Sequence, residues 1–295
     1  MLALGCSQDR SFPIALILAA LPAWSCGDDD GGPCQCPADQ VINCGHRGTG
    51  QNSQANDFPE NTLPSFERAV LEGADMVELD VQHSSDGALV VIHDDEVDRT
   101  TDSTGCVGDY TIAELQEMDA GHGTPLAGSG VFLPTLEEVF DAVDAAVNVE
   151  IKVSDTAGCP PSDRAALAED VVTAIASDTK DRLIVVSSFD LDVLLEVQDL
   201  EPSIPLGYLS LVASDAQVAA ASGMAALNVL GGLLGEDDIA DILALGLDAN
   251  VWTINDPGMM DSFLSWGVDM IITDEPELLE ERRESFCNLY CGASD

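Results

Sequence analysis

Short apolar runs alternate with helical patterns along most of the chain. Nine runs are typical of strands, and they cover residues 41–46, 75–81, 88–93, 147–153, 183–188, 205–209, 225–230, 249–254 and 268–273. Helical spacing of apolar residues marks 61–72, a stretch that begins at Thr135, and about 163–178, 190–200, 214–222, 236–245 and 257–266. This alternation predicts an α/β fold on a parallel sheet.

The second and third strands are separated only by residues 83–87. A crossover helix between parallel neighbours needs more residues than this, and Asp86-Gly87 is typical of a hairpin turn. A turn centred on Ser85 and Asp86 would place His93 opposite Glu78. Without the returning strand eight strands remain, which is the number that closes a (β/α)8 TIM barrel.

Residues 94–131, which follow the hairpin, are too long and irregular for an ordinary loop between a strand and a helix. The stretch includes a glycine-rich segment from Gly121 to Gly130. We expect it to form an insertion beside the barrel rim at which the sites of this fold lie, where it shapes access to such a site. A surface excursion without a function is the alternative.

Polar residues gather at the ends of four of the predicted strands: His46, Glu78, Asp80, His93, Glu150 and Lys152. Residues i and i+2 share one face of a strand, so Glu78 pairs with Asp80 and Glu150 pairs with Lys152. Histidines, carboxylates and cations in one place suit a site that holds a divalent metal and a phosphate while it moves protons.

The charge balance excludes some functions. The 54 acidic residues outnumber the 10 basic ones, for a formal net charge of −44. No basic stripe exists to contact the phosphates of a nucleic acid, so nucleic-acid binding is excluded. The same charge argues against docking on anionic lipid surfaces.

The N-terminus has the pattern of an export signal. An apolar run from Phe12 to Trp24 suits the hydrophobic part of a signal peptide and is too short to span a bilayer. We therefore expect a signal peptide over 1–25, a flexible tether over 26–40 and the catalytic barrel over 41–295. Cys26 follows a stretch that resembles a bacterial lipobox, which implies export to the bacterial periplasm or cell surface and membrane contact only through a lipid at Cys26. An ordinary signal peptide cleaved elsewhere is the alternative.

Several short motifs occur in a definite order. They are His46-Arg47-Gly48, Pro59-Glu60-Asn61-Thr62, Gly73-Ala74-Asp75, Glu78-Leu79-Asp80-Val81, Asp86-Gly87, His93-Asp94, Arg99-Thr100-Thr101, Leu133-Pro134-Thr135-Leu136, Glu150-Ile151-Lys152, Trp252-Thr253-Ile254-Asn255 and Thr273-Asp274-Glu275-Pro276. Any one of them is weak evidence. The ordered series, over about residues 41–280, closely resembles the glycerophosphodiester phosphodiesterase family.

The resemblance implies a metal-dependent enzyme. Glu78, Asp80 and Glu150 would ligate one divalent cation, Ca²⁺ or Mg²⁺, because both ions prefer oxygen ligands. His46 and His93 would be the general acid and base, since imidazole is suited to proton transfer near neutral pH. The alternative for the carboxylates is a set of solvated charges at the barrel rim.

The resemblance also suggests roles for neighbouring residues. Substrate binding would fall to Arg47 and Lys152, which contact phosphate, and to Trp252, which covers the glycerol carbons. Glu60 and Asn61 would orient Arg47 or the metal ligands, with helix capping as their alternative. Asp94 would orient His93. We expect the other two histidines, His83 and His122, to lie at the surface.

The implied reaction is hydrolysis of a small glycerophosphodiester to sn-glycerol 3-phosphate and an alcohol. A phospholipase of the sphingomyelinase D type is an alternative, but it would need an apolar rim and usually a distinctive C-terminal tail, and neither is evident in the sequence. A surface lipoprotein without catalytic activity is a second alternative.

Export permits disulfides, and the cysteines fall into regional groups. In a closed barrel the first and last strands are neighbours. Cys34 and Cys36, before the first strand, can therefore meet Cys287 and Cys291, which follow the last predicted helix. We expect two bonds between these pairs with undetermined connectivity, and a local Cys287–Cys291 bond is the alternative.

Three other cysteines lie within the barrel sequence. Cys106 belongs to the insertion and Cys159 to the loop after the Glu150 strand, both at the catalytic face. A bond between them would pin the insertion over the site. Cys44 lies inside the first strand, where we expect a buried free thiol.

Overall fold

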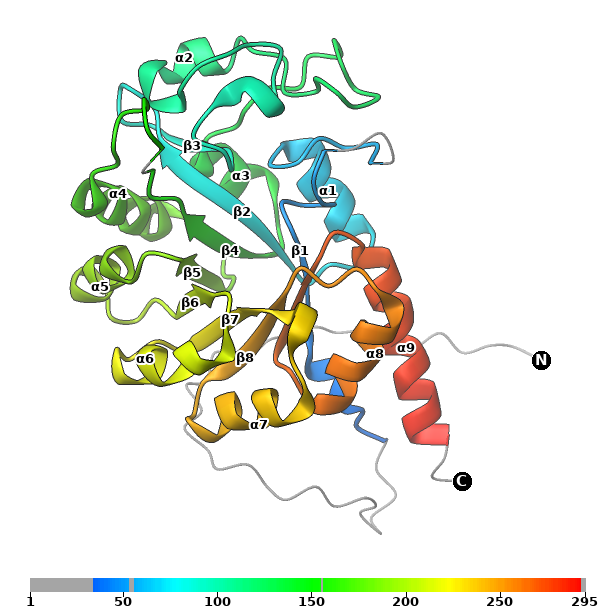
Figure 1. Cartoon of the computed structure of the whole chain (residues 1–295). Coiled ribbons are helices and arrows are strands. Elements are labelled where there is room, and N and C mark those ends of the chain that lie inside the picture. The colour runs from blue at the N-terminus through cyan, green and yellow to red at the C-terminus, as the bar shows by residue number, and fades with distance from the viewer. Residues whose placement is uncertain (1–33, 53–55, 155, 293–295) are drawn as a thin grey trace.

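Eight parallel strands close into a barrel that helices surround (Figure 1). The computed structural model describes residues 34–52, 56–154 and 156–292. The parallel strands are β1 (Ile42–Gly45), β2 (Met76–His83), β4 (Ala146–Ile151), β5 (Ile184–Ser188), β6 (Leu206–Ser210), β7 (Ala226–Leu230), β8 (Asp248–Trp252) and β9 (Met270–Thr273). The sheet closes because β1 pairs with both β2 and β9. The expected (β/α)8 TIM barrel is confirmed.

Helices pack their apolar faces on the outside of the barrel. They are α1 (Leu63–Leu71), α3 (Leu136–Ala142), α4 (Arg164–Ser177), α5 (Leu191–Leu200), α6 (Ala216–Ala221), α7 (Glu236–Ala244), α8 (Pro257–Trp266) and α9 (Pro276–Gly292). A further helix, α2 (Ile112–Leu115), belongs to the insertion described below. Local signals set their ends: Thr135 and Glu138 form a capping box at α3, and Gly267 ends α8 at φ 74°. In the described parts of the chain, no helix has the length and apolar character to cross a membrane.

The predicted hairpin is present, but its register differs by one residue. β3 (Leu89–Val91) runs antiparallel to β2, with Val81 opposite Val91 and His83 opposite Leu89. The turn is therefore centred on Asp86, and the prediction that His93 pairs with Glu78 is wrong. His93 lies beyond the end of β3. The predicted turn was too tight: Ser84 N–H donates to the Ala88 carbonyl oxygen, and Gly87 at φ 84° completes the loop.

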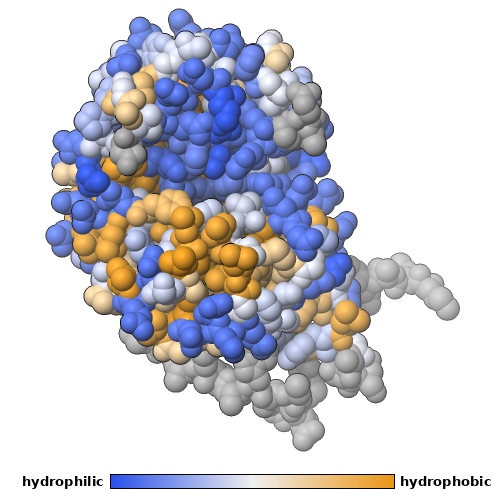
Figure 2. Space-filling model, in the orientation of Figure 1, coloured by the Kyte–Doolittle hydropathy of each residue, from blue (hydrophilic) through white to orange (hydrophobic). Residues whose placement is uncertain are grey.

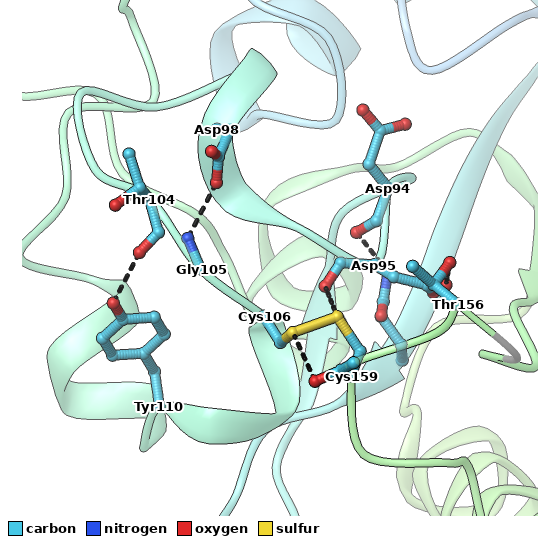
Figure 3. The surroundings of a disulfide bond; sticks show 11 residues. Asp94, Asp95, Asp98, Thr104, Gly105, Cys106, Tyr110, Thr156 and Cys159 are labelled. Atoms are coloured by element: carbon cyan, nitrogen blue, oxygen red, sulfur yellow. Dashed lines mark hydrogen bonds between the residues drawn. A yellow bond between two sulfur atoms is a disulfide. The ribbon is translucent and has the colours of Figure 1, made fainter.

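The insertion after β3 has an apolar core of its own. Two short 3-10 helices, η2 (Val97–Arg99) and η3 (Val107–Asp109), and α2 enclose the buried side chains of Val97, Val107, Leu115 and Leu133. The expected Cys106–Cys159 disulfide joins this insertion to the loop after β4 (Figure 3). The insertion is thus a small packed unit fixed to the catalytic face.

The two ends of the described chain meet at the opposite face. The bonds are Cys34–Cys291 and Cys36–Cys287, which resolves the connectivity that the sequence left open. Both C-terminal cysteines lie inside α9 and do not follow the last helix. Residues 37–40 form the 3-10 helix η1 (Pro37–Gln40). The expected signal peptide, the tether up to residue 33 and Cys26 lie outside the described residues.

Buried polar contacts reinforce this junction. Arg283 of α9 donates to the Asp75 carboxylate over 2.7 Å and to the Ala38 carbonyl oxygen of η1 over 3.2 Å. Cys44, inside β1, is fully buried and is the one unpaired cysteine among the described residues, as expected.

Candidate active site

Parallel register brings three carboxylates together at the C-terminal end of the barrel. Glu78 and Asp80 lie two residues apart on β2, so both side chains point into the barrel. On the adjacent β4, Asp80 is aligned with Glu150. Each of the three carboxylates offers an oxygen within 4.8 Å of the other two, and all three side chains are buried.

A fully buried oxygen of this cluster has no hydrogen-bond partner among the described residues. Asp80 Oδ2 accepts from Asn61 Nδ2 at 2.8 Å, whereas buried Asp80 Oδ1 has no hydrogen-bond partner among the described residues. Glu78 Oε2 accepts from the Arg47 backbone N–H at 2.9 Å, and Glu150 Oε1 accepts from Lys152 Nζ at 2.8 Å. Three hard oxygen donors with an unsatisfied oxygen among them fit a Ca²⁺ or Mg²⁺ ion.

The electrostatics of the cluster agree with this fit. Burial raises the pKa of Glu78 well above its ordinary value, and the negative charges of Asp80 and Glu150 add to the effect. Burial also raises the pKa of Glu150, although Lys152 opposes the shift. The pKa of Asp80 shifts in the opposite direction. Burial alone would raise this pKa, but the charges of Arg47 and Lys152 lower it. Without a cation, the carboxylates repel one another.

His46 follows β1 and is hydrogen-bonded to Asp274. Its Nδ1 lies 2.6 Å from Asp274 Oδ1, and Asn255 Nδ2 donates to Asp274 Oδ2 at 2.7 Å. This contact directs Nε2 of His46 toward the pocket. The sequence analysis assigned no role to Asp274 or Asn255, although both belong to motifs quoted above. Their proximity to His46 could have been predicted, because the ends of the first and last strands are neighbours in a closed barrel.

His93 lies on the other side of the pocket and is also paired with an aspartate. Its Nδ1 is 2.6 Å from Asp94 Oδ1. Arg99 of η2 donates to both Asp94, at 2.6 Å, and Glu60, at 2.7 Å. Arg99, like Asp274 and Asn255, is a residue that the sequence analysis quoted in a motif but did not assign. It connects the insertion to both the His93 side and the β1 side of the site.

Arg47 is held by carboxylates on two sides. Its Nη1 donates to Glu60 Oε1 at 2.8 Å, and its Nε lies 3.4 Å from Asp80 Oδ2. Arg47 and Asn61 have left-handed backbone conformations, with φ of 52° and 57°, which are uncommon for residues other than glycine. The Asn61 N–H donates to the Arg47 carbonyl oxygen at 3.0 Å and ties the two strained positions together. Such strain is concentrated at functional sites.

Several of these residues line one pocket. It has a volume of about 50 Å³ and is bordered by His46, Arg47, Glu78, His93, Asn148, Glu150, Lys152, Ser187, Phe189, Leu209, Trp252 and Ile272. Trp252 donates its Nε1 hydrogen to the Asn228 carbonyl oxygen, and its ring meets Phe189 edge to face at 5.5 Å between centroids. The sequence analysis did not single out Phe189.

The remaining expected residues are placed around the pocket or away from it. Glu60 and Asn61 contact Arg47 and Asp80, whereas Thr62 is the N-cap residue of α1. His83 lies outside the barrel, 3.0 Å from Asp170 of α4, and His122 is exposed on the insertion. A larger cavity of about 160 Å³ lies at the other end of the barrel, but no histidine, lysine or arginine lines it.

Comparison with known proteins identifies the family. The model of the glycerophosphoryl diester phosphodiesterase family matches residues 46–278. A glycerophosphodiester phosphodiesterase of Caldanaerobacter subterraneus is 35% identical over 246 residues, which cover 79% of this chain and 94% of that protein. A phosphodiesterase structure from Oleispira antarctica, in complex with the product sn-glycerol-3-phosphate, superposes with a TM-score of 0.73 at 25% identity and covers 85% of this chain and all of that one. A Thermotoga maritima glycerophosphodiester phosphodiesterase structure has a TM-score of 0.63 at 30% identity, covering 81% of this chain and 97% of that one. The chain belongs to the glycerophosphoryl diester phosphodiesterase family.

Proposed function

We propose that this protein is a metal-dependent phosphodiesterase that cleaves glycerophosphodiesters to sn-glycerol 3-phosphate and an alcohol. The observation that carries the proposal is the pairing of two histidines, each with its own aspartate, beside a buried three-carboxylate cluster in one pocket. The named activities of the relatives, and the product bound in the Oleispira antarctica structure, support the same substrate class.

Glu78, Asp80 and Glu150 would hold the cation. A bound Ca²⁺ or Mg²⁺ would neutralise phosphate charge and lower the pKa of a coordinated hydroxyl. Asn61 supports the set by its hydrogen bond to Asp80, and the Arg47 backbone supports it through Glu78. These contacts orient the carboxylates before any ion arrives.

His46 and His93 would move the protons. In the first step the secondary hydroxyl oxygen of glycerol attacks phosphorus, and the bond from phosphorus to the head-group alcohol breaks. One histidine takes the proton of the attacking hydroxyl, and the other gives a proton to the departing alcohol oxygen. In the second step a water oxygen attacks the cyclic phosphate and the ring bond to the secondary oxygen breaks, with the two histidines in reversed roles. The overall reaction consumes one water.

Each histidine would be oriented by its aspartate. Asp274 for His46 and Asp94 for His93 accept from Nδ1 and leave Nε2 to exchange the proton. Arg99 acts as a positioning residue, because it links Asp94 to Glu60, which in turn links to Arg47. Through this network, the position of His93, which transfers protons, would be coupled to that of Arg47, which binds phosphate.

Arg47 and Lys152 would bind the phosphate, and Trp252 would cover the glycerol carbons. Both cations line the pocket and already face carboxylates. Asp80 and Glu150 hold Arg47 and Lys152 beside the pocket, where both positive side chains would meet the phosphate. Trp252 offers an apolar surface at the pocket wall, fixed by its hydrogen bond to Asn228.

We also propose export, with a lipid anchor at Cys26. Three disulfides in the described residues support folding in an oxidising compartment. Mass spectrometry of the protein from a membrane fraction tests the anchor: a diacylglyceryl-modified Cys26 at the mature N-terminus is the expected result, and an unmodified terminus elsewhere contradicts it.

The activity is tested with purified, oxidised protein and glycerophosphocholine, glycerophosphoethanolamine and intact sphingomyelin as substrates. We expect glycerol 3-phosphate from the first two in the presence of Ca²⁺ or Mg²⁺, and none after exhaustive chelation. Cleavage of sphingomyelin alone would favour the sphingomyelinase D alternative. No cleavage of any diester would favour the binding lipoprotein.

A further inference from the structure

A second cavity lies inside the barrel at the N-terminal ends of the strands, and we call it the N-terminal cavity. It has a volume of about 160 Å³, and residues that begin strands border it, among them Ile42, Ala226 and Asp248. The active-site pocket opens at the other end of the barrel, where a hydrophilic hollow is visible (Figure 2). Layers of branched side chains usually fill the interior of such a barrel, so a cavity of this size is unusual.

Small residues on two neighbouring strands leave this space open. Gly207 of β6 is paired with Ala226 of β7, and both line the cavity. A larger residue in place of Gly207 would disturb its neighbour, because a Cβ there would lie 2.8 Å from Asn228 Nδ2. The cavity therefore follows from the particular residues on β6 and β7, which also keep the Asn228 side chain in its place.

Buried asparagines give the N-terminal cavity a polar floor. Asn148, Asn228 and Asn250 line it, and Asn250 Nδ2 donates to Asn228 Oδ1 at 2.8 Å. Asn148 Oδ1 accepts from Ser187 Oγ at 2.9 Å, whereas buried Asn148 Nδ2 has no hydrogen-bond partner among the described residues. Ser187 lines the active-site pocket and takes one side of the Asn148 carboxamide, so the unpartnered N–H group is left on the side of the N-terminal cavity. A buried donor of this kind requires an acceptor.

Two carboxylates lie at the mouth of the cavity. Asp248 begins β8, and Asp269 directly precedes β9, which is paired with β8. Burial raises the pKa of both groups, and the charge of Asp248 adds to the shift of Asp269. Among the described residues, no lysine, arginine or histidine lines the cavity to balance this charge. A cation bound at the mouth would therefore be stabilised.

Simpler occupants satisfy only part of this lining. The carboxylates would attract a metal ion, but a metal ion cannot accept a hydrogen bond from Asn148 Nδ2. An anion could accept that bond, but Asp248 and Asp269 would repel it. Water alone supplies an acceptor and leaves the negative charge unbalanced. A molecule that has both a positive group and an oxygen acceptor satisfies the floor and the mouth together.

We propose that the N-terminal cavity binds a small amino alcohol, a primary ammonium ion that carries a hydroxyl group. The ammonium group would donate to Asp248 and Asp269, and the hydroxyl oxygen would accept from Asn148 Nδ2. The carbon chain would contact the apolar part of the lining, which includes Met76 and Met270. A cavity of about 150 Å³ can hold a molecule as large as benzene, so a short amino alcohol fits.

Ethanolamine is the simplest compound of this class. It is also the alcohol that the proposed reaction would release from glycerophosphoethanolamine. The binding proposal does not rest on that reaction, because binding is measured without turnover. If no diester is cleaved, the proposed function fails and the binding measurement still decides on the cavity.

The test is calorimetric titration of the oxidised protein at pH 7 with Ca²⁺ present to occupy the active-site carboxylates. The probes are ethanolamine, ethylammonium and ethylene glycol. Ethanolamine should bind about tenfold or more tightly than either of the others, because ethylammonium offers no acceptor to Asn148 Nδ2 and ethylene glycol carries no charge.

Variants test where ethanolamine binds. Asp248→Asn/Asp269→Asn should weaken its binding about tenfold or more, since both charges at the mouth are lost. Ala226→Leu should abolish binding because the larger side chain fills the cavity, and if this variant does not fold, the mouth variant still decides. The matched control is Asp237→Asn/Asp241→Asn, which removes two exposed carboxylates from α7 and should bind as the wild type does.

Other results overturn the proposal. Without saturable binding of ethanolamine, the cavity holds only water. Equal affinities for ethanolamine and ethylammonium would remove the contact with Asn148. An equal loss in the α7 control and the mouth variant would show general attraction to an acidic protein. Glu150→Gln should bind ethanolamine normally, and a loss confined to that variant would place the ligand in the active-site pocket instead.

Discussion

His46 and Asp274 are 228 residues apart in the sequence, yet His46 Nδ1 and Asp274 Oδ1 lie 2.6 Å apart. The reason is barrel closure: Gly45 of β1 is paired with Thr273 of β9, so the residues that follow these two strands emerge together. The pairing of β1 with β9, which closes the barrel, therefore brings one of the two histidine–aspartate pairs together.

Replacing Asp274 should impair turnover without loss of the fold. In Asp274→Asn, the side chain can no longer stabilise a positively charged His46, so we expect kcat to fall by about 10²-fold with little change in KM. Steady-state kinetics with glycerophosphocholine measures both constants. Asp256→Asn is the matched control, because asparagine can still cap α8. A kcat close to that of the wild type in Asp274→Asn would leave His46 without its proposed orienting partner.

Substitutions in the carboxylate cluster should lower activity, and one of them should at the same time raise stability. Glu78→Gln, Asp80→Asn and Glu150→Gln should each lower activity by at least about 10²-fold, because each removes a charged ligand from a small set. Burial and like charges raise the pKa of Glu78, so Glu78→Gln should also raise the melting temperature of the metal-free protein. The scale is about 2–4 °C per kcal/mol for a domain of this size. Ca²⁺ or Mg²⁺ should stabilise the wild type and not this variant; stabilisation of both would contradict the site.

The stability of the protein and the placement of the insertion should depend on the Cys106–Cys159 disulfide. Cys106→Ser/Cys159→Ser should lower the free energy of unfolding by about 2–4 kcal/mol and raise KM, because the bond fixes the insertion beside Asp94 and Asp95. Urea unfolding and steady-state kinetics give the two quantities. Cys36→Ser/Cys287→Ser removes a bond at the other face and should lower stability while KM stays unchanged. Peptide mapping without reduction that finds a free Cys106 would refute the bond itself.

Asp269 should make stability fall with rising pH. Burial raises its pKa to about 6, and the charge of Asp248 adds to the shift, while a hydrogen bond from the Ala249 N–H opposes it. The folded protein therefore keeps this proton up to a higher pH than the unfolded chain does. Asp269's stabilising contribution is complete below the ordinary aspartate pKa of about 4 and is lost as pH rises to about 6.

Asp269→Asn should remove this dependence. Asparagine can still accept from Ala249, so the variant should gain about 1–3 kcal/mol over the wild type at pH 7 and little at pH 4. Urea unfolding at both values measures the gain, and Asp241→Asn on the exposed side of α7 controls for the loss of one negative charge. Equal gains in the two variants would show that general charge repulsion, and not burial, is responsible.

The sequence predicted the barrel and the gathering of most candidate residues around one pocket, because both follow short-range rules. Alternating strands and helices fix the fold class, and residues two apart on a strand face the same side, which places Glu78 with Asp80. The hairpin register could not be predicted, because turns that differ in length by one residue differ little in free energy. Asp274 was missed as the partner of His46 because the two residues are 228 positions apart in the sequence. Arg99 was missed because its contact with Glu60 spans 39 residues and joins the insertion to a different loop.

The exposed apolar side chains at the ends of neighbouring strands could not be predicted as a group for a related reason. Phe189, Leu211 and Leu230 come from the separate ends of β5, β6 and β7, and each alone looks like an ordinary exposed apolar residue. Their grouping depends on the order of β5, β6, β7 and β8 around the barrel. The sequence contains the residues, but only the three-dimensional arrangement makes them neighbours.

The disulfides at the N-terminal face determine how the protein bears mechanical tension. A pull on the chain ahead of Cys34, the direction in which the proposed anchor at Cys26 would act, passes through the bonds to Cys291 and Cys287 into α9. The force is then transmitted through covalent bonds to α9, and the hydrogen bonds that hold β1 in the barrel do not carry it. His46 follows β1 directly, so tension at the proposed anchor would leave this histidine in place.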